Sequence, residues 1–302
     1  MSNQGQSESR AYITCPNFPT YHYYWLRDGS LIAYAIDTAE EFFSAEAFFQ
    51  WVGRAIQKYG AKGENVRHHL EAGLTIEKDV VLHTRYTLDG NEVTIDNAWG
   101  NFQIDGYGTW LWALAEHLRR SGDAALLKEL SGPVQITLRY LELIWELPHY
   151  DCWEEHPEHF HPYSLATVFA GFDSIVSLVR SGWIDACPLA VNEIAGQVKK
   201  LLMKYAVHDG HLNKHVWPGR ADESPKPILP SGVDSSLICI SVPYNVLIPD
   251  DPLVKAWKFN MKEHRFIKHK RKNRSSRGIG RWMRQNRLPK SAYPRRTNLG
   301  KF

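Results

Sequence analysis

Three adjacent residues, Trp153, Glu154 and Glu155, combine an indole ring with two carboxyl groups. An apolar neighbour and a second negative charge each raise the pKa of a carboxyl group, which is the property that a general acid needs. Such a group suits acid catalysis on a sugar, with one Glu of the pair as the acid and Trp153 as part of the binding surface. Because a Trp-Glu-Glu sequence is by itself more often a solvated edge, its interpretation depends on other parts of the chain.

The segment of residues 21–29 reads Tyr-His-Tyr-Tyr-Trp-Leu-Arg-Asp-Gly and precedes a helical pattern. In the simplest interpretation its aromatic residues enter the core, while Arg27 and Asp28 form an ion pair at a helix start. In a pocket wall the same residues would bind a sugar. Arg27 would donate hydrogen bonds in fixed directions, Asp28 would accept from two neighbouring hydroxyls, and Trp25 would stack on the ring face.

A second aromatic segment, residues 99–112, reads Trp-Gly-Asn-Phe-Gln-Ile-Asp-Gly-Tyr-Gly-Thr-Trp-Leu-Trp. Its three glycines allow close backbone approach. Trp99 and either Gln103 or Asp105 can then reach a common ligand. The whole chain is rich in aromatic residues, with eleven Trp, fourteen Tyr and twelve Phe, and this composition fits a carbohydrate site.

The elements that position these residues are predicted to be mostly helical. One long or broken helix is expected over residues 30–59 and is ended by Gly60 and Gly63. Further helices are expected at residues 109–120, 134–146, 162–180, 188–205 and 234–245. An alternating pattern around Asp89-Gly90 predicts a small β-hairpin near residues 80–96. This order indicates paired helices packed side by side, or a toroid, rather than βαβ units.

The charge is unevenly distributed along the chain. Residues 264–302 hold fourteen Lys or Arg and no Asp or Glu, whereas residues 1–263 hold 22 basic and all 33 acidic residues. We therefore expect an N-terminal segment (1–20), a folded domain (21–255) and a basic tail (256–302). The four cysteines form no Cys-x-x-Cys pair, the first residues lack an apolar core, and no stretch reaches the ~20 apolar residues of a membrane span. These features predict a cytoplasmic protein without membrane contact.

Histidines cluster after the glutamate pair, at positions 156, 159 and 161, with His149 and Asp151 nearby. A metal site is one interpretation, but these spacings match no familiar ligand pattern. The prediction is therefore that they line a polar pocket without a metal. The glycines form neither a dinucleotide-binding nor a phosphate-loop fingerprint, and no cofactor is predicted.

The motifs occur in the order Tyr-x-Tyr-x-Trp-x-Arg-Asp-Gly, Trp-Gly-Asn-Phe-Gln-Ile-Asp-Gly-Tyr-Gly and Asp-Cys-Trp-Glu-Glu. This arrangement resembles glycoside hydrolase family 15, the glucoamylase-like family, over about residues 21–251. The resemblance implies an all-α (α/α)6 barrel whose central funnel holds the terminal glucose of an α-glucoside. It also implies that Glu154 is the general acid, that Glu155, Arg27 and Asp28 bind substrate, and that Trp99 lines the pocket.

The chain departs from the family pattern at the catalytic base. The family places this Glu in a late segment, but no acidic residue follows Glu263 here. The base is therefore not found, and an incomplete barrel is expected. A shift of reading frame near residue 255 explains the basic tail better than a nucleic-acid-binding arm does, because the tail has no recognisable RNA-binding module.

The resulting hypothesis is an inverting, exo-acting hydrolase that releases glucose from the non-reducing end of an α-glucan or α-glucosyl disaccharide. Its activity is expected to be impaired unless another carboxylate supplies the base. The alternative is a non-catalytic sugar-binding remnant of such an enzyme. Both hypotheses predict an α-glucan or α-glucosyl oligosaccharide as the partner and do not predict nucleic acid.

Overall fold

The computed structural model describes residues 7, 9–18, 21–77, 79–93, 100–185, 190–217, 219, 226–227 and 234–258. Helices dominate the described part and are accompanied by short antiparallel strand pairs. The helices are α1 (Leu26–Thr38), α2 (Phe42–Tyr59), α3 (Ala61–Glu71), α4 (Asp105–Ser121), α5 (Ala124–Glu129), α6 (Ser131–Ile144), α7 (Pro162–Arg180), α8 (Val191–Tyr205) and the 3-10 helix η2 (Ser235–Ile240). The strands are β1 (Tyr24–Trp25), β2 (Arg85–Tyr86), β3 (Val207–His208), β4 (His211–Leu212), β5 (Val216–Trp217) and β6 (Lys226–Pro227).

The helices expected at residues 109–120, 134–146, 162–180 and 188–205 are observed as α4, α6, α7 and α8. Helix ends follow local chemistry. Pro162 starts α7, because a proline at the first turn loses no intrahelical hydrogen bond. Gly122 ends α4 in the left-handed conformation, with a φ of 73°. Directly after it, the Asp123 carboxylate accepts from the backbone amides of Ala125 and Leu126 and caps α5.

The helix expected at residues 30–59 takes the broken form of that prediction: α1 and α2 are separated by a turn in which Glu40 has a φ of 64°. Two helix predictions need correction. Gly60 does not end the helical run, because its backbone is right-handed and α3 begins at the next residue. The helix expected at 234–245 is only the short η2, since Pro243 offers no backbone N–H and disfavours helical geometry at Val242.

The predicted β-hairpin is confirmed as a small antiparallel element. Tyr86 forms a bridge with Glu92, and the Thr87 amide donates to the Asn91 carbonyl at 2.7 Å. Gly90 supplies the positive φ, 76°, that the turn requires. The structure adds that β2 also pairs with β1, with Trp25 opposite Arg85. Residues 94–96 of the predicted hairpin lie outside the described residues.

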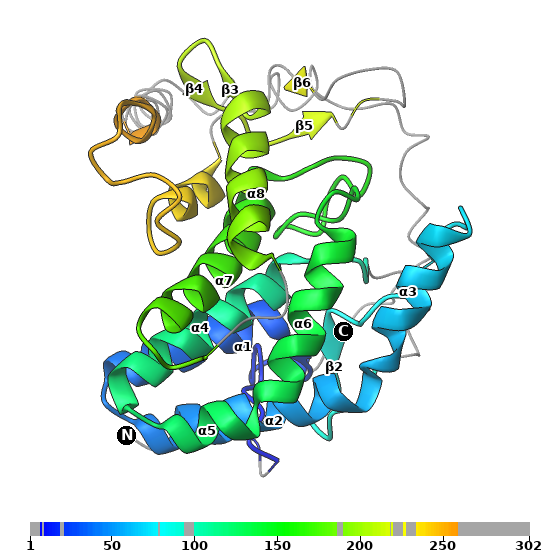
Figure 1. The fold of residues 1–302 in the computed structure, drawn as a ribbon, viewed down its shortest axis with the longest axis vertical. Coiled ribbons are helices and arrows are strands. Elements are labelled where there is room, and N and C mark those ends of the chain that lie inside the picture. The colour runs from blue at the N-terminus through cyan, green and yellow to red at the C-terminus, as the bar shows by residue number, and fades with distance from the viewer. Residues whose placement is uncertain are drawn as a thin grey trace, which may run out of the picture. The chain divides into compact units, whose positions relative to one another are not determined.

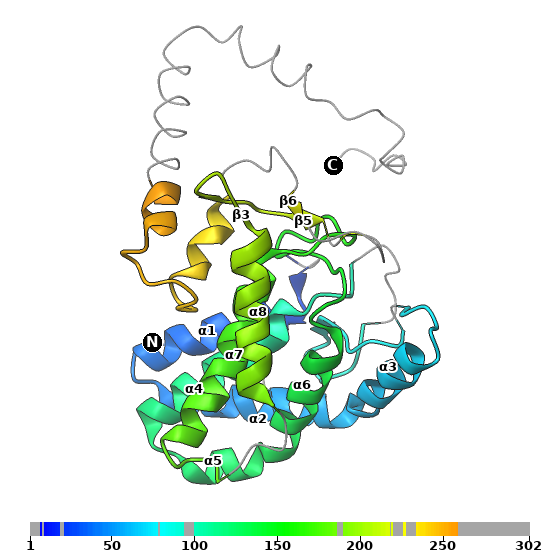
Figure 2. The same ribbon diagram turned by 45° about the horizontal axis from the view of Figure 1, so that its top comes forward.

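The core is built around α7, α4 and α1. In Figure 1, α8 lies alongside α7, and α1 lies close to α4. Figure 2 shows the same neighbours after a turn of 45°. By length and composition α7 resembles a membrane span, but 83% of its apolar window is buried within the protein. It is therefore accounted for as the central helix of the core.

Two glycines set how closely α4 packs against its neighbours. A Cβ atom on Gly106 would lie 2.8 Å from the Leu26 Cβ atom of α1. A Cβ atom on Gly108 would lie 2.5 Å from the backbone of Thr167 in α7. Gly171, also in α7, lies against the backbone of Gly108. The helices α4 and α7 therefore touch main chain to main chain. The first turn of α4 is thereby fixed against both helices.

Backbone contacts divide the chain into one unit of residues 1–255 and a second of residues 256–302. The second unit contains the basic tail, of which all residues after 258 lie outside the described part. The domain limits at 20 and 255, and both explanations of the tail, stay predictions.

A matched pair of glycine substitutions tests the contact between α4 and α7. Gly108→Ala should lower the free energy of unfolding by about 2 kcal/mol, because the new methyl group meets the backbone of α7. Gly196→Ala on α8 meets no atom within 4 Å and should raise it by up to about 1 kcal/mol, since alanine favours a helix. Urea unfolding measures both values. Equal effects at the two positions would contradict the main-chain contact.

Candidate active site

The first part of the site is an ion pair between α1 and α4. Arg27 Nη1 donates to Asp105 Oδ2 at 2.9 Å and to Gln103 Oε1 at 3.0 Å. Arg27 Nε lies 3.6 Å from Asp28 Oδ2. Burial alone would lower the pKa of Arg27, but the carboxylates of Asp105 and Asp28 outweigh it and raise this pKa. The guanidinium group therefore stays charged and fixed in direction.

Asp28 occupies the accessible end of this ion pair. Burial raises the pKa of Asp28, and the negative charges of Asp105 and Glu154 act in the same direction, against the charge of Arg27. Its side chain is 36% exposed, whereas that of Asp105 is fully buried. Asp28 can therefore accept hydrogen bonds from a ligand, while Asp105 holds Arg27 in place.

Glu154 joins this group through two hydrogen bonds. Its Oε1 atom accepts from the indole Nε1 of Trp25 at 3.2 Å and from the Nε2 atom of Gln103 at 3.1 Å. Because the other end of the Gln103 amide accepts from Arg27, Gln103 links the basic and the acidic parts of the site. Both hydrogen bonds that the described residues give to the Glu154 carboxylate end on Oε1, so the Oε2 atom is left for a ligand.

The loop that carries Glu154 is organised by Asp151. The Oδ1 atom of Asp151 accepts from the backbone amides of Trp153 and Glu155 at 2.9 and 2.8 Å. Its carbonyl oxygen accepts from the amide of Glu154 at 2.9 Å. Glu154 has a φ of 62° in this turn, a left-handed conformation that is uncommon for a residue with a side chain. Asp151 therefore determines the direction of the glutamate.

A lysine connects this loop to later parts of the chain. Lys214 Nζ lies 3.2 Å from Asp151 Oδ2, 3.2 Å from Glu155 Oε2 and 3.7 Å from Asp234 Oδ2. Burial acts to lower the pKa of Lys214, but the charges of Asp151 and Asp234 outweigh it and raise this pKa. Asp234 in turn accepts from the Trp153 indole at 3.2 Å.

The structure separates the predicted site residues into two groups. Trp25, Arg27, Asp28 and Glu154 lie together in one hydrogen-bonded and electrostatic group. Trp153 and Glu155 instead contact the cluster around Lys214, and the Trp153 side chain is 53% exposed. Trp99 lies outside the described residues.

Sequence reasoning missed Lys214 and understated Asp151. Lys214 follows a loop with no motif of its own, and only its closeness in space to Asp151 gives it a role. The signal for Asp151 was present in its place two residues before the Trp-Glu pair, where an Asp commonly accepts from following amides.

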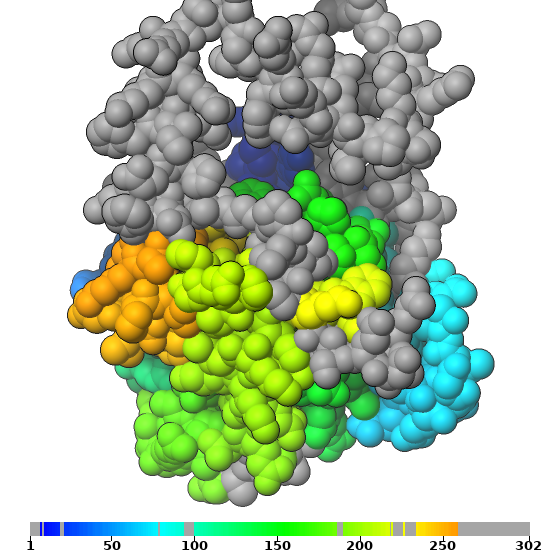
Figure 3. Space-filling model, turned by 90° about the horizontal axis from the view of Figure 1, so that it is seen from above, coloured from blue at the N-terminus to red at the C-terminus, as the bar shows by residue number. Residues whose placement is uncertain are grey.

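Two histidines near this loop are buried, unlike the side chains of a solvated loop. His161 and His215 are 1% and 8% exposed, and their Nδ1 atoms are 3.2 Å apart. Burial lowers the pKa of His161 and of His215 to about 3 each, and neighbouring imidazoles act in the same direction. Viewed from above, the green surface of the loop before α7 meets the yellow surface of β5 and β6 (Figure 3).

Comparison with known proteins places this geometry in a family. Residues 7–183, more than half of the chain, match the family described as Glycosyl hydrolases family 15. The chain belongs to glycoside hydrolase family 15. An isomaltose glucohydrolase of Kribbella flavida is 32% identical over 249 residues, which cover 82% of this chain and 60% of that protein. An uncharacterized glycosyl hydrolase of Methanocaldococcus jannaschii is 24% identical and is covered over 34% of its length.

Solved structures of glycosidases agree with this assignment to glycoside hydrolase family 15. A wild-type glycosidase superposes with a TM-score of 0.73 at 30% identity, over 83% of this chain and 64% of that one. A glycosidase variant in complex with glucose gives the same values. A glucoamylase of Hormoconis resinae has a TM-score of 0.52 at 16% identity, over 73% of this chain and 37% of that one. The predicted (α/α)6 barrel class is confirmed, and the chain spans less than two thirds of the length of these relatives.

The loop of residues 151–155, which carries Glu154, is named the acid loop. Removing Lys214 should loosen this loop. Lys214→Met leaves the charge of Asp151, which is 2% exposed, without its cation, and should lower the free energy of unfolding by about 3 kcal/mol. Urea unfolding at neutral pH measures the loss. Lys200→Met, at an exposed position on α8, is the matched control and should change it by less than about 0.5 kcal/mol. Similar losses in both variants would contradict the role of Lys214.

The contribution of Asp234 should depend on pH. Burial acts to raise the pKa of Asp234, but hydrogen bonds from Ser236 and Trp153 and the charge of Lys214 hold it below its usual range. A lowered carboxyl pKa gives stability that is present above the ordinary value of about 3.9 and is lost as the pH falls through the lowered one. Asp234→Asn should therefore cost about 1 kcal/mol at pH 7 and progressively less towards pH 3.

Unfolding by urea at several pH values measures this difference. The same substitution at the exposed Asp250 is the control and should show a small effect that does not grow with pH. A constant penalty for Asp234→Asn from pH 7 to pH 3 would contradict the ionic role of Asp234.

Proposed function

We propose that this chain is an α-glucosidase-type hydrolase that acts on the non-reducing end of an α-glucosyl disaccharide or α-glucan. The observation that supports this proposal most directly is the contact of Glu154 with Trp25 and Gln103, and through Gln103 with Arg27. An acid is thus held beside a charged and hydrogen-bonding sugar-binding wall. The membership of glycoside hydrolase family 15 supports the same reaction class.

In this proposal Glu154 is the general acid. Two donors fix its Oε1 atom, so the proton is delivered from Oε2 to the glycosidic oxygen as the bond from that oxygen to the anomeric carbon breaks. Water attacks the anomeric carbon from the opposite face, and a second carboxylate about 6.5–9.5 Å from the acid has to take the proton from that water. Because no acidic residue follows Glu263, where the family places this base, another carboxylate has to supply it. The configuration is inverted, and glucose is the product.

The remaining predicted residues have binding roles in this scheme. Asp28, at the accessible end of the Arg27–Asp105 pair, accepts from sugar hydroxyls. The exposed indole of Trp153 offers a flat face for a second sugar ring at the pocket edge. Glu155, held by Lys214, provides an acceptor on the same edge.

Isomaltose is the first substrate to test. The Kribbella flavida relative is named an isomaltose glucohydrolase, and a similar glycosidase was solved with glucose. Maltose, trehalose and soluble starch would compare other linkages and lengths.

The second candidate function is sugar binding without hydrolysis. It is favoured by the sequence after residue 263, which contains no carboxylate that matches the family's base. In this candidate the group of Arg27, Asp28 and Trp25 holds a sugar, and Glu154 has no partner to complete the reaction.

Glucose release by the purified 302-residue chain tests both functions. Glu154→Gln should reduce release at least about 100-fold while the binding of glucose, measured by calorimetry, persists, because only proton transfer is lost. Glu158→Gln, four residues further on and 52% exposed, is the matched control and should leave release unchanged. Binding without release in the wild type supports the second function, and neither binding nor release by folded protein overturns both.

A further inference from the structure

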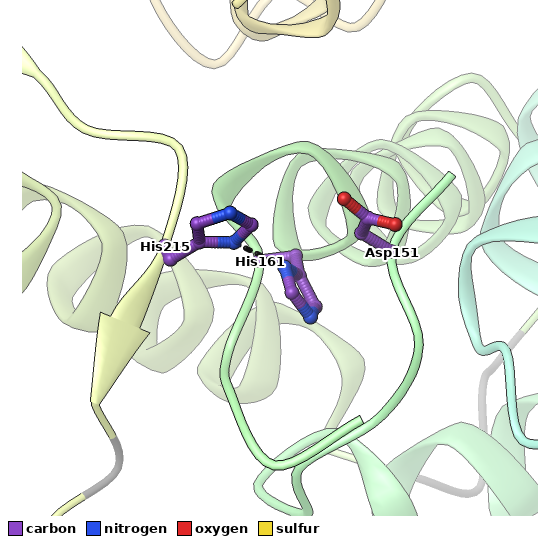
Figure 4. Close-up of side chains that lie close together, drawn as sticks. All are labelled: Asp151, His161 and His215. Atoms are coloured by element: carbon purple, nitrogen blue, oxygen red, sulfur yellow. Dashed lines mark hydrogen bonds between the residues drawn. The ribbon is translucent and has the colours of Figure 1, made fainter. Parts of the chain in front are cut away.

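Two histidines meet across a pair of antiparallel segments next to the acid loop. Phe160 and Val216 exchange two backbone hydrogen bonds of 2.9 Å each. The next pair along these segments, His161 and His215, is therefore a non-hydrogen-bonded pair, the position at which opposite side chains come closest. Their Nδ1 atoms are 3.2 Å apart. The dashed line in Figure 4 marks this contact.

Asp151 faces the same point from the acid loop. One carboxylate oxygen of Asp151 and one ring nitrogen from each of His161 and His215 all lie within 4.8 Å of one another. All three residues are buried. Asp151 and His161 lie at the two ends of one loop, and His215 lies far along the chain. Figure 4 shows the three side chains close together.

We propose that Asp151, His161 and His215 form a binding site for a divalent transition metal ion such as Zn²⁺. In a tetrahedral zinc site with Zn–N distances of about 2.0–2.1 Å, two ligand nitrogens lie roughly 3.3 Å apart. The observed 3.2 Å between the two Nδ1 atoms fits this spacing. Two imidazoles and one carboxylate also form a donor set that suits zinc or cobalt better than magnesium or calcium.

The surrounding hydrogen bonds fix two of these ligands, His161 and Asp151, in the orientation that a metal needs. His161 Nε2 lies 2.9 Å from the carbonyl oxygen of His156, and donation to that oxygen leaves a lone pair on Nδ1. A ligating histidine in a metal site typically donates its second N–H in this way. The Asp151 carboxylate is fixed by the hydrogen bonds that it accepts from the backbone amides of Trp153 and Glu155.

Lys214 supplies the positive charge when no metal is bound. Its ammonium group lies 3.2 Å from Asp151 Oδ2, so metal and lysine compete for the same carboxylate. Lys214 can give up Asp151 because it also pairs with Glu155 and Asp234. This competition predicts binding in the micromolar range, weaker than at a structural zinc site. Metal binding would tie the acid loop to the start of α7.

A second group, His156, Glu158 and His159, is the competing location. It is more exposed, and both of its imidazoles already pair with Glu158 at 3.4 Å. It also lacks the cross-strand geometry that brings His161 and His215 together. The buried group is therefore the better site, and the two locations can be told apart by substitution.

Metal titration of the full chain tests the proposal. Calorimetry should show one Zn²⁺ bound per chain, and Co²⁺ should give a visible absorption band typical of four-coordinate N and O ligands. His215→Ala should weaken binding by more than about 100-fold, since losing only a ligand's hydrogen-bond partner already costs about 10–100-fold. His159→Ala is the control and should bind as the wild type does.

X-ray absorption spectroscopy of the zinc-loaded wild type identifies the metal ligands directly. This test does not depend on whether a variant folds. It should show two imidazole ligands and oxygen at about 2.0–2.2 Å. Wild-type affinity in His215→Ala, loss of binding in His159→Ala, fewer than two imidazoles, or no micromolar binding at all would each overturn the proposal.

Discussion

The site depends on the buried ion pair between Arg27 and Asp105. Taking two charges out of water is costly, so such a pair persists only where the backbone holds both partners in good geometry. Here that geometry comes from the close packing of α4, whose glycines admit α1 on one side and α7 on the other. Any side chain at these glycines would move Asp105 relative to Arg27. The Gln103 amide, which Arg27 holds at its oxygen, passes this fixed geometry on to the Glu154 carboxylate through its Nε2 atom.

The acid loop has a different basis. It has little regular structure, and its shape comes from one carboxylate that accepts two amides of the following turn. Lys214 and Asp234, far along the chain, then hold the loop from outside. The candidate site is thus made of a closely packed helical wall and a loop fixed by charges. Substitutions in the wall act through packing, whereas those around the loop act through unpaired charge.

The sequence predicts the helical wall well. The apolar spacing of α7 gives its bounds, and the aromatic and Arg-Asp motif places Trp25, Arg27 and Asp28 at the start of a helix, where the structure has them. Local signals do this because helix periodicity and turn residues are properties of neighbouring residues. The sequence allows a break between α1 and α2 but does not give its position, because Glu40, which turns the chain there, is not a typical helix-breaking residue.

The parts that escape prediction are contacts between distant segments. Nothing near Lys214 or His215 in the sequence indicates a partner, and both gain one only when β5 is placed beside residue 160. The same limit applies to Gln103, whose two-sided role between Arg27 and Glu154 needs three segments at once. Spacing alone therefore grouped the loop histidines with one another and left out the one that lies opposite His161.

The pairing of Phe160 with Val216 also determines when the site is completed as the chain is made. The wall needs only residues up to about 171, because the contacts described for it come from β1, β2, α1, α4 and the first half of α7. The acid loop lacks its lysine and its strand partner until residues 214–216 have emerged. The wall is therefore expected to assemble on the growing chain before the loop of Glu154 is fixed in direction, because the residues of the wall emerge first.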